Sequence, residues 1–115
     1  MLSQRFRFHG HGSLNYLYRN GRTLRTPEIT VRYLENPHRV HSRYTVIISK
    51  KVLKRAVARN RLRRRIYEII RKEKIHTTPG FDVALSVFKG DLLEIPHEEL
   101  KQKILSAFKN AKLTE

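Results

Sequence analysis

The sequence predicts a single α+β domain in which helices cover a small β-sheet. Segments that alternate apolar and polar residues, as strands do, are interleaved with segments of helical period. The chain has 115 residues, 39% of them hydrophobic, which suits one compact domain with its own core. We therefore expect one domain over residues 1–115, with the irregular residues 1–12 as a candidate flexible N-terminal arm.

A short helix is predicted near the N-terminus, over residues 13–21 (SLNYLYRNG). Leu14, Leu17 and Tyr18 recur at i, i+3 and i+4 and so share one face. Ser13 is a candidate N-cap, and Gly21 stands where a helix commonly ends.

Three strands are predicted from alternation and β-branched content. They cover residues 28–34 (EITVRYL), 43–49 (RYTVIIS) and 81–88 (FDVALSVF). Pro27 suits the start of the first of them.

Two further helices are predicted, one long and basic from about Arg55 and one that opens at Pro96. In the last helix Glu98 and Glu99 fall in the first turn, where the helix dipole favours acids. The basic helix carries an apolar stripe that we expect to face the sheet, formed by Val57, Leu62, Ile66, Ile69 and Ile70.

The net charge points to a polyanionic partner. The chain has 25 Lys plus Arg against 10 Asp plus Glu, a net charge of +15 and a pI near 10.8. A nucleic-acid backbone is the usual partner of such charge, and an anionic membrane surface is the alternative. Charge kept only for solubility is the third explanation, but a small domain needs a net charge of roughly 2 to 8 for that purpose.

Features that the sequence lacks limit the kinds of metal site and the cellular location that we expect. The chain has no cysteine, which excludes disulfides and thiolate metal sites. No apolar run approaches the length of a membrane span, and the N-terminal residues lack the apolar core of a secretory signal. We expect a soluble cytoplasmic protein.

The basic helix is the candidate binding element. Residues 49–72 contain eleven Lys or Arg and one acid, Glu68, so few acids are available to form pairs along the helix. Arginine presents a planar fork that matches phosphate oxygens, and Asn60 adds an amide that donates and accepts. Phosphate-backbone binding is the favoured interpretation, and a solvated basic face is the alternative.

Other candidate sites are weaker. The first helix is either core or a platform on which unpaired bases stack. His9 with His11, and His38 with His41, have spacings seen in metal sites but no acidic or thiolate companion, so surface histidines are expected. No pair of carboxylates is spaced to hold two metal ions, so we predict binding and no catalytic centre or metal site in the protein itself.

The stretch SKKVLKRAVARNRLRRRI resembles the signature of the bacterial ribonuclease P protein subunit. It has a strand ending in Ser49-Lys50-Lys51, a short basic spacer, and Arg59-Asn60-Arg61 on a long helix. The resemblance extends to SLNYLYRNG as the family's aromatic first helix, RTPEITVRYL as its early strand and FDVALSVFKG as its last strand.

This resemblance implies a fold and a function. The implied fold is a two-layer α/β sandwich with a mixed sheet of about four strands, three helices and a left-handed β-α-β crossover, similar to the second domain of ribosomal protein S5. The implied function is that of a subunit that binds the catalytic ribonuclease P RNA and assists removal of the 5′ leader of precursor tRNA. The cutting chemistry and its Mg²⁺ ions are implied to belong to the RNA, and neither a membrane nor an obligate protein partner is expected.

The resemblance also implies which residues bind RNA. A cleft formed by the sheet and the first helix is implied to hold the leader, with Leu14, Tyr18 and Arg32 in it. The RNA-facing positions are Lys50, Lys51, Lys54, Arg55, Arg59, Asn60, Arg61, Arg63, Arg64 and Lys89.

The chain departs from the family pattern at two of its functional positions. Leu14 stands where an aromatic residue is usual, and Tyr67 where a basic residue is common, so that Tyr67 either removes one phosphate contact or supplies a stacking ring.

Two other functions remain as alternatives. One is a general structured-RNA-binding module without a role in tRNA processing, and the other is a free-standing nuclease, which the absence of a carboxylate cluster disfavours.

Overall fold

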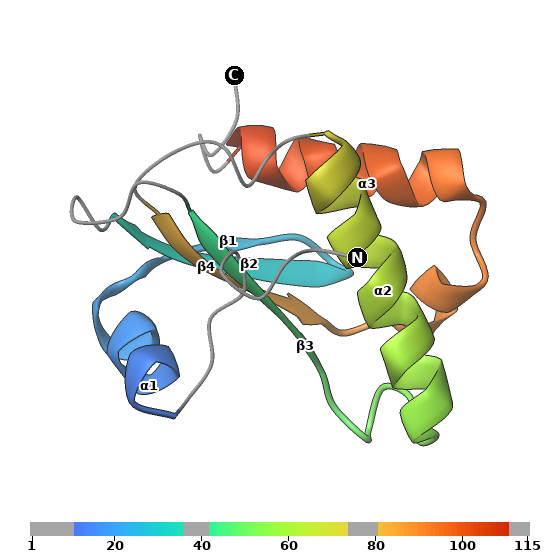
Figure 1. The fold of residues 1–115 in the computed structure, drawn as a ribbon, viewed down its shortest axis with the longest axis horizontal. Helices are drawn as coiled ribbons and strands as arrows, with labels where there is room; N and C mark the ends of the chain where they lie inside the picture. The colour runs from blue at the N-terminus through green and yellow to red at the C-terminus, as the bar shows by residue number, and fades with distance from the viewer. Residues whose placement is uncertain (1–10, 36–41, 74–80, 111–115) are drawn as a thin grey trace.

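The computed structural model describes residues 11–35, 42–73 and 81–110, and of residues 11–15 only the backbone. It confirms the predicted α+β fold (Figure 1). The elements in chain order are α1 (His11–Asn20), β1 (Arg22–Arg25), β2 (Ile29–Glu35), β3 (Arg43–Ile48), α2 (Ala56–Lys72), β4 (Phe81–Val87), the 3-10 helix η3 (Gly90–Leu93) and α3 (His97–Asn110).

The sheet is mixed, with strand order β1-β2-β4-β3. β1 pairs antiparallel with β2, and β2 antiparallel with β4, whereas β3 runs parallel to β4. A parallel pair needs a crossover connection, and α2 lies within it. This is the predicted β-α-β unit around the basic helix, and its handedness stays a prediction.

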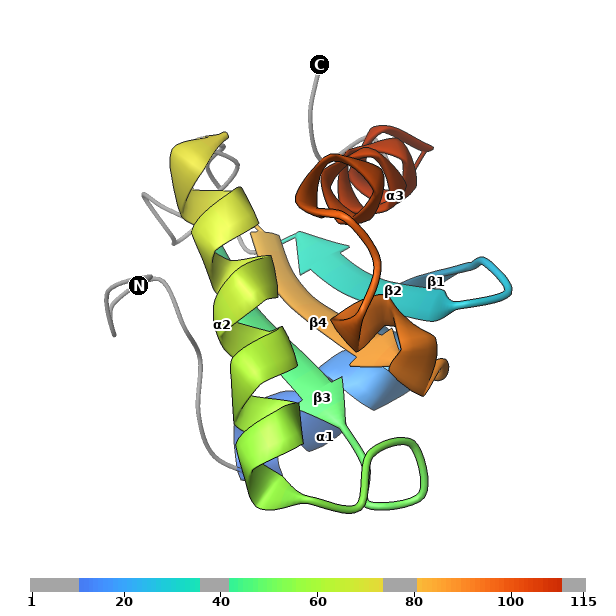
Figure 2. The ribbon, with the colours of Figure 1, turned by 90° about the vertical axis from the view of Figure 1, so that its right-hand side faces the viewer.

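The two faces of the sheet are covered unequally. On one face the inward residues of the strands pack with α2 and α3 into the main core, which includes Val31, Leu85 and Val46. On the other face α1 packs by Leu17 against Ala84, with Leu34 and Ile47 beside them. Figure 2 shows α2 and α3 on one side of the sheet and α1 on the other. Because α1 covers only part of its face, the rest of the sheet is left accessible.

The basic helix α2 packs by the predicted apolar stripe, with one exception. Leu62, Ile66, Ile69 and Ile70 are buried. The prediction for Val57 is wrong, because this residue is 76% exposed in the first turn of the helix. The stripe thus begins at Leu62, and the first turn of α2 projects beyond the core.

Tyr67 is buried, which excludes one of the two alternatives for this residue, that it supplies a stacking ring. Its side chain is 3% exposed, and its hydroxyl accepts a hydrogen bond of 3.2 Å from the backbone N–H of Val46. Nε of Arg63 donates to the carbonyl oxygen of the same Val46 at 3.3 Å. Since β3 is an edge strand, α2 satisfies backbone groups that no neighbouring strand can reach.

Two predictions for the N-terminal region are wrong, the N-cap of the first helix and the end of the flexible arm. α1 begins at His11, so Ser13 is not its N-cap and residues 11–12 do not belong to an arm. The predicted arm otherwise lies outside the described residues. Gly21 follows the helix as predicted, and a Cβ there would lie 2.6 Å from the carbonyl oxygen of Leu17, so only glycine fits this close approach.

The strand β1 was missed, and Pro27 has a different role. β1 has four residues and little alternation of burial, so it gives no periodic signal. Pro27 does not start a strand but lies in the turn between β1 and β2, which Thr26 closes by hydrogen bonds with Ile29.

Among the described helices none is long and apolar enough to cross a membrane.

Candidate nucleic-acid interface

The predicted basic residues gather at the end of the sheet where β3 passes into α2. Lys50, Lys51, Lys54 and Arg55 are exposed in the connecting loop, whose turn is closed by hydrogen bonds from Val52 N–H and Leu53 N–H to the Ser49 carbonyl. In the described part of the chain the four basic side chains have neither an ion pair nor a hydrogen bond. They therefore leave four positive charges open to solvent.

Lys89 joins the same end of the molecule from β4. Parallel strands end at the same edge of a sheet, so the residues after β4 lie beside those after β3. The contact is close, because a Cβ on Gly90 would lie 2.7 Å from the Val52 carbonyl oxygen. Lys89 is exposed next to this contact. The loop and Lys89 thus contribute to one basic surface.

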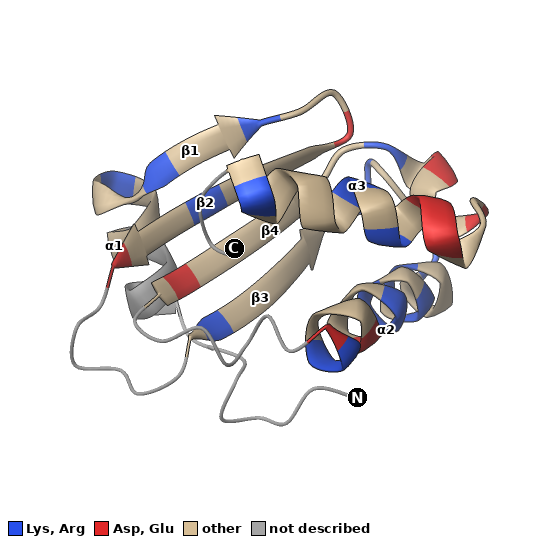
Figure 3. Cartoon of the chain, turned by 90° about the horizontal axis from the view of Figure 1, so that it is seen from above, with Lys and Arg blue, Asp and Glu red and all other residues tan. Residues whose placement is uncertain are grey.

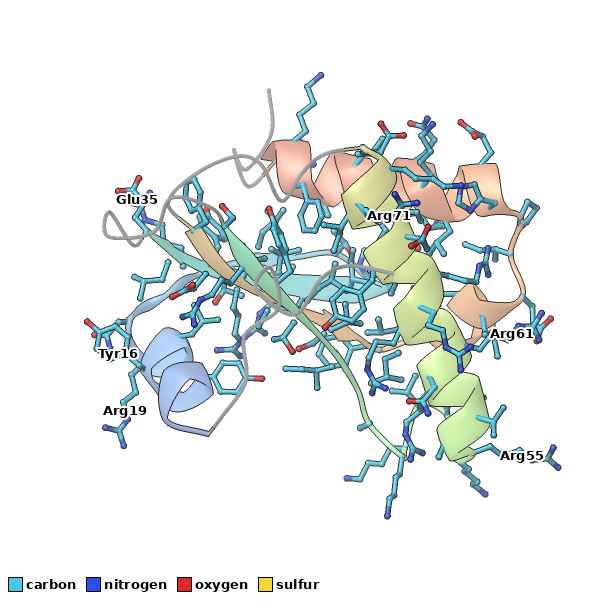
Figure 4. All side chains as sticks on the ribbon, in the orientation of Figure 1. Tyr16, Arg19, Glu35, Arg55, Arg61 and Arg71 are labelled. Atoms are coloured by element: carbon cyan, nitrogen blue, oxygen red, sulfur yellow. The ribbon has the colours of Figure 1, made fainter. Side chains whose placement is uncertain are left out.

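The first turn of α2 adds to the positive potential of this surface. It contains no acid, and its N-cap residue Arg55 makes no side-chain capping bond. The free N–H groups at a helix N-terminus carry partial positive charge, which adds to the field of the four basic side chains around them. On the face of α2 away from the core, Asn60, Arg61 and Arg64 are exposed. Figure 4 labels Arg61 on this helix and Arg55 at its start.

Three other arginines of α2 donate hydrogen bonds to backbone carbonyl groups of the protein. Nη1 of Arg59 donates to the carbonyl oxygens of Leu53 and Lys54, both at 2.9 Å. Arg63 donates to the Val46 carbonyl and, at 2.7 Å, to Oδ1 of Asn60. Arg59 and Arg63 were predicted only as RNA-facing, so the structure adds an intramolecular role to both.

Arg65 makes the most extensive of these internal contacts. Its guanidinium donates to the carbonyl oxygens of Leu92 at 3.2 Å, Leu93 at 2.6 Å and Ile95 at 2.9 Å. It therefore ties η3 to α2. The arginines at the basic end thus form two groups. We call Arg55, Arg61 and Arg64 the outward arginines, and Arg59, Arg63 and Arg65 the anchored arginines.

A cleft lies on the sheet face that α1 leaves open. It has a volume of about 520 Å³. Two of the predicted leader-binding residues line it and meet there, because the guanidinium carbon of Arg32 lies 4.7 Å from the centre of the Tyr18 ring. Leu14, the third, lies in α1, and its side chain falls outside the described part of the structure. The complete lining is Tyr18, Arg25, Thr26, Thr30, Arg32, Ser86 and Phe88.

Sequence reasoning missed most of this lining. Phe88 is 56% exposed and belongs to the same face as Ser86, which the alternation of β4 could have indicated. Thr30 lies directly opposite Ser86 in the pairing of β2 with β4. That pairing brings residues more than fifty positions apart into one floor, and no local pattern in the sequence encodes it.

One acid, Asp91, lies two residues after Lys89, and others are grouped at the start of α3. Glu98 and Glu99 occupy the first turn of α3, which Figure 3 shows together with the basic residues along α2. Lys103 forms an ion pair with Glu28 at 2.6 Å, and Lys101 one with Glu73 at 2.9 Å; the paired carboxylates raise the pKa of both lysines. Within the described ranges, no three His, Asp or Glu side chains come together to hold a metal ion.

Comparison with known proteins identifies the family. The family model for ribonuclease P matches residues 2–112. A protein of Synechococcus elongatus named ribonuclease P protein component is 41% identical over 91 residues, which cover 76% of this chain and 75% of that protein. A protein of the same name from Carboxydothermus hydrogenoformans is 34% identical over 73% of this chain and 75% of its own length.

Solved structures share the fold. The RNase P protein of Staphylococcus aureus matches with a TM-score of 0.83 at 21% identity, over 96% of this chain and 98% of that one. The RNase P protein of Thermotoga maritima matches with a TM-score of 0.80 at 23% identity, over 90% and 96%. On the evidence of the family model and of these relatives, the chain belongs to the ribonuclease P protein family.

Proposed function

We propose that this ribonuclease P protein binds the RNA subunit through its basic surface and the 5′ leader of precursor tRNA in its cleft, and so assists removal of the leader. The observation that carries the proposal is that the chain has two separate surfaces of different chemistry. One is an exposed cationic surface at the start of α2, and the other is a cleft that combines cations with aromatic rings.

The basic surface suits a folded RNA. Its exposed charges come from a loop, a helix and the end of β4, so they fit a phosphate backbone of matching shape and do not read base edges. Each phosphate that a Lys or Arg neutralises releases counterions, so this binding weakens as salt rises. The RNA phosphates also offset the mutual repulsion of the basic side chains, which explains why the protein tolerates a net charge of +15.

The cleft suits a single strand. Unpaired bases stack on aromatic rings, while arginines bind the phosphates between them. Tyr18 and Phe88 supply rings, and Arg25 and Arg32 supply positive charge around the same cavity. The 5′ leader of precursor tRNA is single-stranded, and it is the segment that we assign to this cleft.

Catalysis is assigned to the RNA. The described carboxylates do not fit a two-metal centre, since no three metal-ligating side chains converge. We propose that the Mg²⁺ ions of the reaction are held mainly by the RNA subunit and the substrate. The protein then contributes affinity for the leader and reduces repulsion between the two RNAs, which lowers the amount of Mg²⁺ required.

Reconstitution tests this function directly. The purified chain is added to a bacterial ribonuclease P RNA at an Mg²⁺ concentration where the RNA alone cleaves slowly. We expect leader removal to accelerate, and the gain to shrink when the leader is shortened to one nucleotide, because the cleft is then empty. If the chain binds the RNA but accelerates nothing, it is a general structured-RNA-binding module. If the chain cuts RNA by itself with a metal ion, catalysis has been assigned to the wrong component.

A further inference from the structure

One polar side chain on the exposed face of α2 carries no charge. Asn60 is exposed and stands between Arg59 and Arg61 in the sequence. Arg64 follows one helical turn later, so Asn60 and Arg64 share a face of the helix. A side-chain amide has a donor end and an acceptor end, so the group that it meets in RNA depends on which end faces outward.

The contact with Arg63 decides which end of the amide faces outward. Nη1 of Arg63 lies 2.7 Å from Oδ1 of Asn60. A guanidinium can only donate, so only the oxygen of the amide can face it. The Nδ2 group, with its two N–H donors, therefore points away from Arg63. Within the described part of the chain this group makes no hydrogen bond.

Arg63 is itself held on a second side. Its side chain is half-buried, and its Nε donates to the carbonyl oxygen of Val46, on the edge strand β3, at 3.3 Å. Because the guanidinium is planar and rigid, this contact restricts where Nη1 can lie. The Asn60 amide is thus oriented before RNA arrives, which lowers the entropy cost of binding through it.

We propose that Arg63 is a positioning residue that turns the Asn60 amide so that its N–H groups face the RNA, and that Asn60 thereby selects a hydrogen-bond acceptor. The inference rests on the proposed function and deepens it, because it adds an uncharged, directional contact to a surface of charges. A donor of the RNA, such as the amino group of a base, does not fit this site. A phosphate oxygen, a ribose 2′-oxygen or an acceptor on a base edge does.

Binding of the full chain to a ribonuclease P RNA over a range of salt concentrations tests the donor role of Asn60. Asn60→Ala should weaken binding by about 3- to 10-fold at every salt concentration, as expected for one net hydrogen bond. The slope of log K against log salt should stay unchanged, because a neutral amide releases no counterion. Gln102→Ala, which removes an exposed amide of α3, is the matched control and should change neither quantity. Full affinity or a reduced slope in Asn60→Ala contradicts the donor role.

A double-variant cycle tests the positioning role of Arg63. Arg63→Ala should weaken binding by about 2- to 5-fold, because the amide then turns freely, and the double variant should bind no more weakly than Asn60→Ala alone. If the two losses multiply, or if Arg63→Ala lowers the salt slope by about 0.9 units, Arg63 meets the RNA on its own and does not position Asn60. Each variant is measured at a temperature where circular dichroism shows that it is folded, so lost stability is not counted as lost affinity.

Nucleotide analogues identify the acceptor. Pools of the RNA carry phosphorothioate, 2′-deoxy or deazapurine substitutions, which alter a phosphate oxygen, a 2′-hydroxyl or a base acceptor. We expect one position to impair binding of the unmodified chain but not of Asn60→Ala, and the kind of substitution names the acceptor. If no position behaves in this way, the donor role is wrong.

The outcomes separate the two proposals. If the unmodified chain binds the RNA and accelerates leader removal, but Asn60→Ala binds as tightly, the inference about Asn60 is wrong and the proposed function stands. If the unmodified chain does not bind the RNA, both are wrong.

Discussion

The outward and anchored arginines show that neighbouring residues of one basic helix have different partners. Arg63, Arg64 and Arg65 are consecutive, yet the first reaches the edge of β3, the second faces solvent and the third binds the carbonyl groups around η3. Successive residues of a helix point about 100° apart, so a run of three arginines covers three directions. Charge density therefore marks the helix as the candidate RNA-binding element but does not tell which arginines would meet RNA.

The difference lies in the partners of the guanidinium. An anchored arginine satisfies carbonyl groups that are partly removed from water, and its loss leaves them without a donor. An outward arginine gives up water and counterions only when a phosphate arrives. Mutations of the first group should act mainly on stability, and mutations of the second on the salt dependence of RNA binding.

The largest effect on stability is expected from Arg65→Ala. It removes three hydrogen bonds to the carbonyl groups of Leu92, Leu93 and Ile95. Because Arg65 is half-buried, we expect the free energy of unfolding to fall by about 2–4 kcal/mol, measured by urea titration. Arg64→Ala is the matched control and should change it by less than about 0.5 kcal/mol. Equal losses of unfolding free energy in the two variants would contradict the distinction between anchored and outward arginines.

The next largest effect is expected from Arg59→Ala, because Arg59 holds the loop that carries three exposed lysines. Without its bonds to the Leu53 and Lys54 carbonyls the loop should open more often. We expect a loss of about 1–2 kcal/mol in unfolding free energy and faster amide hydrogen exchange over residues 50–55. Exchange as slow as in the unmodified chain would show that Arg59 does not hold the loop.

A smaller effect is expected from Tyr67→Phe, which removes the acceptor for the Val46 N–H at the edge of β3. The ring stays buried and only the hydroxyl is lost, so unfolding free energy should fall by about 1 kcal/mol. Tyr16→Phe serves as the control because Tyr16 is 61% exposed. If both variants unfold at the same urea concentration, the hydroxyl of Tyr67 does not protect the strand edge.

The smallest effect is expected from Arg71→Ala, which lies outside both groups. Arg71 pairs with Glu68 at 2.9 Å on an exposed part of α2, where solvent screens the charges, so we expect the free energy of unfolding to change very little. The Arg71 guanidinium holds the pKa of Glu68 below its ordinary value, so the contribution is present at neutral pH and is lost as the pH falls through the lowered pKa. Titration of Glu68 by NMR should show its pKa rise in the variant, and an unchanged pKa would contradict the pairing.

Local patterns predicted much of the fold and less of the site. The period of α2 and the alternation in β2, β3 and β4 identified those elements, because each is long enough to show its repeat. β1 is too short to show one. Val57 fits the helical stripe, but only the tertiary structure tells that the core ends before it.

The site depends on contacts between distant segments. The sequence marks Arg32 only through family resemblance and Tyr18 also as part of a candidate stacking platform, and their contact arises because α1 packs on the sheet beside β2. Phe88 and Thr30 become neighbours through the pairing of β2 with β4. The partners of Arg65 come from a turn about thirty residues later, which no period within α2 encodes.

The most direct test of the division among the arginines is the salt dependence of binding to a ribonuclease P RNA. The slope of log K against log salt is measured for the unmodified chain, for the double variant Arg61→Ala/Arg64→Ala, and for Arg65→Ala under conditions where it is folded. We expect the double variant to lower the magnitude of the slope by about 1.4 to 1.8 units, corresponding to two lost phosphate contacts, and Arg65→Ala to leave it unchanged. A slope that falls equally in both variants, or in neither, would contradict the account.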